Sequence, residues 1–175
     1  AMRDSLEVEL VHQSYWRDNE STYTVQPYCV KVFKQRWYVT GYCRERNALR
    51  TFSLDRIHRL TTLSTKFSYP CDFDPDAYFA SSFGIIAGDE FEVETIRLRV
   101  QGMHRQYIRA LPLHHTQREV ETGEWYSVFE YRMKPTFDLR QELLSRGDAV
   151  EVLSPRSLRD EMQSEIKRLQ SLYGL

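Results

Sequence analysis

The sequence has few cysteines, glycines and prolines, and it has no long apolar run. Its cysteines, Cys29, Cys43 and Cys71, are odd in number and lack CxxC spacing, which argues against a disulfide framework or a zinc knuckle. No apolar run approaches the roughly 18 residues of a membrane span. Charged residues directly after Met2 do not fit a secretory signal peptide. We therefore expect a protein of the reducing cytoplasm that makes no membrane contact.

The motifs of common enzymes are also missing. There is no GxSxG, HExxH, Walker loop or GxGxxG. Cys43 and His58 offer a thiol and a base, but Cys43 shares a strand face with Trp37 and is better interpreted as a small core residue. We expect no catalytic activity and no cofactor.

Two sets of residues resemble metal ligands only superficially. Asp72, Asp74 and Asp76 begin like a calcium loop, but the sixth position is Ala77 where glycine is required, and the twelfth is Phe83 where glutamate is required. The adjacent histidines at 114 and 115 would point to opposite faces of a strand. We expect no metal.

The net charge of −1 conceals an asymmetry along the chain. Residues 1–70 carry 11 Lys and Arg against 7 Asp and Glu, a balance of +4, and residues 71–175 carry 13 against 18, a balance of −5. A protein that binds nucleic acid over its whole surface is usually more basic. An anion site on this chain should therefore be local and lie in the first half.

The first half predicts a small antiparallel β domain over residues 1–66. Alternating or β-rich runs, joined by short polar connections, predict strands at 6–12, 23–33, 36–43, 49–54 and 56–63. Such a meander has two unpaired edge strands, and closing into a small barrel is the simplest way to pair them. Pro27 inside the second run indicates an edge or a bulge.

A connector with one short helix is predicted over 67–94. Asp74 is the expected N-cap, Pro75 the first helical residue and Gly84 the C-terminal stop.

Residues 95–175 predict an α+β domain. The order is a strand at 95–101, a helix at 103–111 with apolar spacing, a hairpin around Thr122-Gly123, a helix at 137–147 and a strand at 149–153. This β-α-β-β-α-β order is the pattern of a ferredoxin-like sandwich. A last helix, capped by Ser154 with Pro155 at its first position, carries an apolar face. That face comprises Leu158, Met162, Ile166, Leu169 and Tyr173.

Five arginines between residues 36 and 57 alternate with aromatic residues. The in-phase sets are Arg36, Tyr38, Tyr42 and Arg44 on one strand and Arg50, Phe52, Leu54 and Arg56 on the next. An arginine in phase with Phe52 cannot stay unpaired in a closed apolar core, so Arg50 and Arg56 should emerge at a barrel end or on a groove. Guanidinium groups bind phosphate bidentately and aromatic rings stack bases. The alternative, which composition alone favours, is that Asp55 and Glu45 pair with these arginines while the aromatics form the core.

Several motifs, in order, resemble a known family. PY at 27–28, RWYVTGY at 36–42, RTFSLDRI at 50–57 and FDPDAYFASSFGI at 73–85 resemble a WYL domain, with Val39 in place of the leucine. RLRV at 97–100, LPLHHTQ at 111–117 and DLRQELLSRGDAVEVLSPRSLRDEM at 138–162 resemble the WCX extension that often follows it.

The resemblance implies a ligand-sensing Sm-like or SH3-like barrel and a ferredoxin-like domain from a bacterial transcriptional regulator. Such regulators usually contact duplex DNA through an N-terminal winged helix-turn-helix, which we expect outside this chain, so a C-terminal fragment is favoured over a solitary sensor. The implied effector bears phosphate, as single-stranded nucleic acid or a nucleotide.

The predicted ligand-binding residues are Arg50, Arg56, Arg44, Arg36, Tyr28, Tyr38 and Phe52. The resemblance favours ligand binding by Arg50 and Arg56 before the other residues. It does not decide between a structural and a binding role for Tyr28 and Tyr38. Trp37 is expected to have a structural role. Two rival hypotheses stay open: a stand-alone RNA or single-stranded DNA module, and a dimerisation domain with an inert basic face. The amphipathic last helix makes a homodimer the expected assembly.

Overall fold

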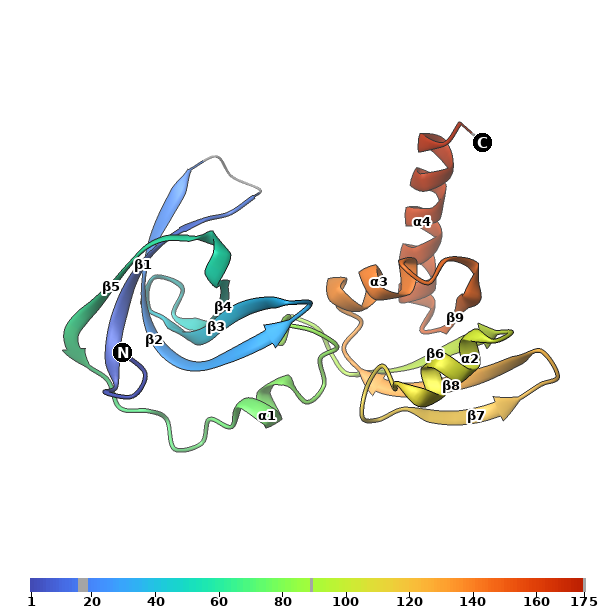
Figure 1. Cartoon of the computed structure of the whole chain (residues 1–175), viewed down its shortest axis with the longest axis horizontal. Coiled ribbons are helices and arrows are strands. Elements are labelled where there is room, and N and C mark those ends of the chain that lie inside the picture. The colour runs from blue at the N-terminus through green and yellow to red at the C-terminus, as the bar shows by residue number, and fades with distance from the viewer. Residues whose placement is uncertain (16–18, 89, 175) are drawn as a thin grey trace. The chain divides into compact units, whose positions relative to one another are not determined.

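The computed structural model describes residues 1–15, 19–88 and 90–174. The chain divides into two compact units, Ala1–Ala80 and Ser81–Leu175, each with its own antiparallel sheet (Figure 1). Four α-helices accompany the sheets in the described residues. None of those helices is long and apolar enough to cross a membrane.

The first unit contains a five-stranded sheet in the order β4-β3-β2-β1-β5. Its strands are β1 (Leu6–Gln13), β2 (Glu20–Phe33), β3 (Arg36–Cys43), β4 (Ala48–Ser53) and β5 (Ile57–Lys66). In the described ranges no ladder joins β4 to β5, so the sheet curves without closing into the predicted barrel (Figure 1). The short turn η2 (Leu54–Arg56) ends β4 and leads the chain to β5, which pairs with β1 instead.

The core of this unit follows from strand alternation. Val8 and Leu10 of β1 face Val25 of β2, and Val39, Cys43 and Phe52 complete the buried cluster. Cys43 is thus a core residue, as predicted. A register shift between Pro27 and Cys29 confirms a bulge there, and β2 is central rather than an edge.

The connector helix α1 (Pro75–Phe79) belongs to the first unit and is shorter than predicted. The Asp74 carboxylate accepts a hydrogen bond from the Asp76 amide at 2.9 Å, which confirms Asp74 as N-cap. The helix ends at Phe79, so the prediction that Gly84 stops it is wrong. Gly84 instead permits the close approach of Asp138, whose Oδ2 would lie 2.3 Å from an added Cβ.

The second unit has the element order β6-α2-β7-β8-α3-β9-α4 and the strand order β7-β8-β6-β9. The elements are β6 (Glu94–Gln101), α2 (His104–Ala110), β7 (Arg118–Thr122), β8 (Tyr126–Met133), α3 (Phe137–Leu144), β9 (Val150–Ser154) and α4 (Arg156–Leu172). The sheet and its helices share one buried core that includes Ile96, Leu98, Phe129, Tyr131 and Leu139.

Two helix predictions in this unit need correction. Met103, Tyr107 and Leu111, whose spacing predicted an apolar face, are exposed, and Ile108 is the buried residue of α2. Pro155 rather than Ser154 is the N-cap of α4, because Ser154 still belongs to β9.

Only the first part of the α4 apolar face is buried. Leu158 and Met162 lie in the core, whereas Ile166, Leu169 and Tyr173 are exposed. The helix therefore presents its last turns to solvent within this unit.

Gln117 explains part of the LPLHHTQ motif. Its side-chain oxygen accepts hydrogen bonds from the Leu113 amide at 3.1 Å and the Tyr131 hydroxyl at 2.9 Å, and its Nε2 donates to the Ile108 carbonyl at 2.9 Å. One side chain thereby ties α2, the following loop and β8 together. His114 is buried and His115 exposed, and the described residues contain no cluster of histidine, cysteine or carboxylate side chains able to hold a metal.

Candidate anion-binding site

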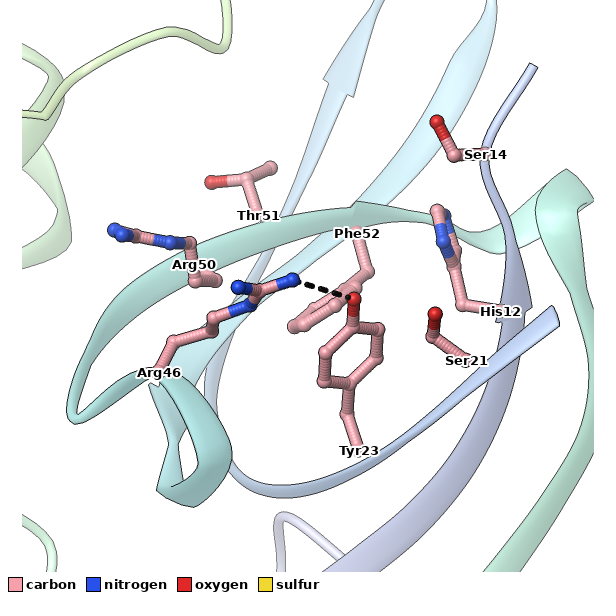
Figure 2. A pocket seen from close by; sticks show the side chains of 8 residues that line it. All are labelled: His12, Ser14, Ser21, Tyr23, Arg46, Arg50, Thr51 and Phe52. Carbon is pink, nitrogen blue, oxygen red and sulfur yellow. Dashed lines mark hydrogen bonds between the residues drawn. The ribbon is translucent and has the colours of Figure 1, made fainter. Parts of the chain in front are cut away.

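A cavity of about 450 Å³ lies on the first unit. Its size falls within the range of small-ligand sites, roughly 300–1,000 Å³. The residues that line it are His12, Ser14, Ser21, Tyr23, Arg46, Arg50, Thr51 and Phe52. Figure 2 shows His12, Ser14 and Ser21 on one side, the two arginines on the other, and the rings of Tyr23 and Phe52 between them.

Arg46 reaches this cavity from the turn η1 (Arg44–Arg46). Asn47 follows in the left-handed conformation, with φ of 47°, and so reverses the chain before β4. The Arg46 Nη2 donates to the Tyr23 hydroxyl at 3.3 Å, and the guanidinium carbon lies 5.7 Å from the ring centroid. This hydrogen bond lowers the pKa of Tyr23. Arg46 is thus held by a neutral group and keeps its full charge.

Arg50 lines the same cavity from the exposed side of β4. Its Nη1 donates to the neighbouring Leu49 carbonyl at 2.9 Å. Gly41 of β3 pairs with Arg50, and an added Cβ on Gly41 would lie 2.1 Å from the Gln26 carbonyl oxygen. Glycine therefore permits the close approach of β2 and β3 beneath the arginine.

Arg56 stands beside the cavity rather than in its lining. Its guanidinium carbon lies 5.1 Å from the centroid of the Tyr15 ring. Its Nε is buried and makes no hydrogen bond to the part of the chain that the structure describes. The positive charge of Arg56 acts on His12, so the two side chains are electrostatic neighbours.

His12 supplies an imidazole on the inner face of the sheet. Its ring meets Phe52 edge-on, with centroids 5.5 Å apart, and its Nε2 is buried without a hydrogen-bond partner among the described residues. Burial, followed by the charge of Arg56, lowers the pKa of His12. The ring is therefore neutral near pH 7 and becomes easier to protonate when an anion binds beside it.

Carboxylates neutralise two of the five arginines. Arg36 pairs with Asp55 at 3.3 Å, and Arg44 pairs with Glu7 of β1. Glu45 does not serve this purpose, because both its oxygens accept the Thr24 amide at 2.9 Å. Among the described residues no carboxylate lies within ion-pair distance of the other three, Arg46, Arg50 and Arg56. Two of these three arginines, Arg46 and Arg50, line the cavity, and the third, Arg56, lies beside it and close enough to Asp55 for an electrostatic interaction.

The structure separates the predicted site residues into two groups. Arg50 and Phe52 line the cavity and Arg56 adjoins it, whereas Arg36, Arg44, Tyr28 and Tyr38 do not line it. Tyr28 and Tyr38 are buried, and Tyr28 packs against Phe67, Tyr69 and Phe73 of the connector. Trp37, predicted to be structural, is 58% exposed. Direct ligand contact by any of these residues stays a prediction.

Each of the two units contains a segment that matches a known domain family. Residues 1–62 match the WYL domain and residues 92–170 match the WCX domain, which together account for most of the chain. The chain belongs to the WYL-domain family. The cavity lies within the range matched by the WYL domain.

The chain is similar to parts of longer proteins. The chain is 27% identical over 164 residues to Protein PafB of Mycobacterium tuberculosis, covering 91% of this chain and 48% of PafB. The structure of proteasome accessory factor B/C (PafBC) of Arthrobacter aurescens is 22% identical, covers 93% of this chain and 24% of that chain, and has a TM-score of 0.43. A crystal structure of a CRISPR Cas-related protein is 13% identical, covers 99% of this chain and 49% of that chain, and has a TM-score of 0.57, which supports the fold alone. The chain spans about half the length of the curated relatives it matches.

Six of the eight residues that line the cavity were not predicted from the sequence. Among them, His12, Tyr23 and Arg46 come from β1, β2 and η1, and no spacing rule connects them. The register of β1 with β2, in which His12 pairs with Ser21, brings the first two together. The alternation of apolar and polar residues along each strand was the only available signal. It shows which residues share a face of the sheet, but not which of them line a cavity.

Proposed function

We propose that this chain is the effector-sensing region of a bacterial WYL-family transcriptional regulator. Its WYL domain binds a phosphate-bearing ligand, single-stranded nucleic acid or a nucleotide, at the cavity between β1, β2 and β4. The full regulator contacts duplex DNA through a separate helix-turn-helix, works in the cytoplasm as a homodimer and catalyses no reaction. The family membership supports the regulatory role.

One observation carries the proposal of an anionic ligand. Arg46 and Arg50 line one small cavity and Arg56 adjoins it, and no described carboxylate lies within ion-pair distance of any of the three, although the Asp55 carboxylate acts electrostatically on Arg56. The net charge of the chain is −1. Unneutralised arginines in one place repel one another, so their grouping favours an anion that binds them together. Guanidinium groups also match the bidentate geometry of phosphate.

We also propose fold classes for the two units. The strongly curved five-stranded sheet supports an incompletely closed, Sm-like or SH3-like barrel for the WYL domain. The order β6-α2-β7-β8-α3-β9 with strand order β7-β8-β6-β9 supports a ferredoxin-like sandwich for the WCX domain.

For signalling, the ligand must bind two conformations of the chain with different affinity. A stand-alone nucleic-acid module would use the same cavity without that requirement. A third function, dimerisation alone, is favoured by the exposed apolar end of α4 at Ile166, Leu169 and Tyr173. If dimerisation is the whole function, removing the charges of Arg50 and Arg56 should change nothing but stability.

Fluorescence anisotropy with short single-stranded DNA and RNA tests the proposal. We expect saturable binding that weakens as salt is raised from 50 to 200 mM, by about sevenfold if two phosphate contacts form at a slope of about 0.7 each. Folded Arg46→Ala and Arg50→Ala variants should bind more weakly. Unchanged binding in both variants would contradict the assignment of this cavity.

A further inference from the structure

The Tyr23 and Phe52 rings of the cavity already contact other side chains. Tyr23 and Phe52 lie with centroids 5.3 Å apart, and Arg46 lies over the Tyr23 ring. Phe52 is only 6% exposed and also receives the edge of His12. The Phe52 ring offers almost no accessible surface to a base, and the Tyr23 ring is already engaged by Phe52 and Arg46. The cavity therefore suits a compact polar group rather than a nucleobase.

The charges favour a group with more than one negative charge. Arg46 and Arg50 line the cavity and Arg56 adjoins it. None of the described residues that line it carries a carboxylate, and the Asp55 carboxylate, which acts on Arg56 and His12, lies outside the lining. An internal phosphodiester carries one negative charge, whereas a phosphomonoester carries about 1.5 to 2 at pH 7. Three guanidinium groups match the monoester better.

The neutral lining groups supply further hydrogen-bond donors for such an oxyanion. The buried Nε2 of His12 makes no hydrogen bond to any described residue. The hydroxyls of Ser21 and Tyr23 stand nearby on β2 (Figure 2). A tetrahedral group with three terminal oxygens can use donors from several directions, which a diester with two free oxygens cannot do as fully.

A stacking surface stands just outside the cavity. Tyr15 is 72% exposed, and the guanidinium carbon of Arg56 lies 5.1 Å from the centroid of its ring. A base attached to a phosphate in the cavity can stack there, and base stacking on an aromatic ring is sequence-tolerant.

We propose that the cavity holds a phosphomonoester, namely the phosphorylated end of a nucleic-acid strand or a nucleoside monophosphate, and that Tyr15 stacks on the adjoining base. The inference rests on the proposed function and narrows its ligand from any phosphate to a terminal one. Strand ends and free nucleotides share this chemistry, and the experiment separates them.

The test compares octathymidylate carrying a 5′-phosphate, a 3′-phosphate or neither, with fluorescein on the opposite end. We expect one phosphorylated form to bind the whole chain at least about tenfold more tightly than the unphosphorylated strand. His12→Ala and Arg46→Ala should abolish that difference, and Tyr15→Ala should weaken binding by about tenfold. Thymidine 5′-monophosphate as competitor shows whether the free nucleotide suffices.

A matched control is Arg59→Ala, which removes one exposed arginine of β5 that does not line the cavity. It should preserve the preference for the phosphorylated end. Equal affinity for all three strands, with loss of binding in Arg46→Ala, would overturn the monoester inference and leave the proposed function standing. No binding of any strand or of the nucleotide would overturn both.

Discussion

Glu7 and Arg44 form a half-buried ion pair whose removal separates a structural arginine from the cavity arginines. The Glu7 side chain is 3% exposed and that of Arg44 is 52% exposed. The Arg44 Nε donates to both carboxylate oxygens, at 3.0 and 3.1 Å, and Gln26 donates to Oε1 at 2.9 Å. Burial raises the pKa of Glu7, but hydrogen bonds from Arg44 and Gln26 outweigh burial, so the pKa lies below its usual value.

Arg44→Ala leaves this carboxylate buried without its cation. Breaking a fully buried pair costs about 3–5 kcal/mol, and charged hydrogen bonds contribute about 1.5–3 kcal/mol. Because Arg44 is half exposed, we expect a loss of about 2–3 kcal/mol in the free energy of unfolding at pH 7. For a unit of this size that corresponds to about 10–20 °C in melting temperature.

The destabilisation caused by Arg44→Ala should depend on pH in a defined direction. The depressed pKa of Glu7 stabilises the fold above pH 4.5, and this contribution is lost as the pH falls through the lowered value. In Arg44→Ala burial dominates and favours the protonated acid, so the destabilisation should be smaller at pH 5 than at pH 8. Urea unfolding of Arg44→Ala, Glu7→Ala and the double variant measures the coupling.

Arg44→Ala should also leave oligonucleotide affinity unchanged within about twofold. A destabilisation below about 0.5 kcal/mol would show that the pair is an ordinary surface contact. A loss of affinity matching that of Arg50→Ala, in folded protein, would refute the structural role given to Arg44.

Further predictions concern stability elsewhere. Gly41→Ala should destabilise the protein by about 1–3 kcal/mol in urea unfolding, because its Cβ would meet the Gln26 carbonyl; a neutral effect would contradict that close approach. His12→Gln should make stability less sensitive to acid between pH 7.5 and 5, because the lowered pKa of His12 favours folding above pH 6.5 and this contribution is lost on acidification; equal pH profiles by thermal melting would count against it. Gln117→Ala should cost about 1–3 kcal/mol, because it leaves the buried Tyr131 hydroxyl without its acceptor; calorimetry showing an unchanged WCX transition would refute this.

Alternation and turn residues predicted most of the strands and helices. The strand predicted at 36–43 has the bounds of β3, and the hairpin predicted around Thr122-Gly123 is formed by β7 and β8, because apolar and polar residues alternate clearly there. The length of α1 and the buried face of α2 escaped prediction. Tertiary contacts decide both. Gly84 lies close to Asp138 and does not end α1, and α2 packs through Ile108 and not through Met103, Tyr107 and Leu111.

The candidate site was predictable only in part. Arg50 and Phe52 could be assigned to one face because they are two residues apart on a strand. The partners of the arginines depend on contacts far along the sequence, such as Glu7 with Arg44, which no local pattern encodes. The same limit hid Arg46, whose position depends on the left-handed Asn47 and on Tyr23 of another strand.

The salt dependence of octathymidylate binding tests the central claim most directly. If Arg46 and Arg50 contact phosphate, the slope of log affinity against log salt should be shallower by about 1.4 in the Arg46→Ala/Arg50→Ala double variant, about 0.7 per lost contact. The Arg59→Ala variant should keep the wild-type slope and affinity. Identical slopes in the wild type and the folded double variant would contradict an anion site at this cavity.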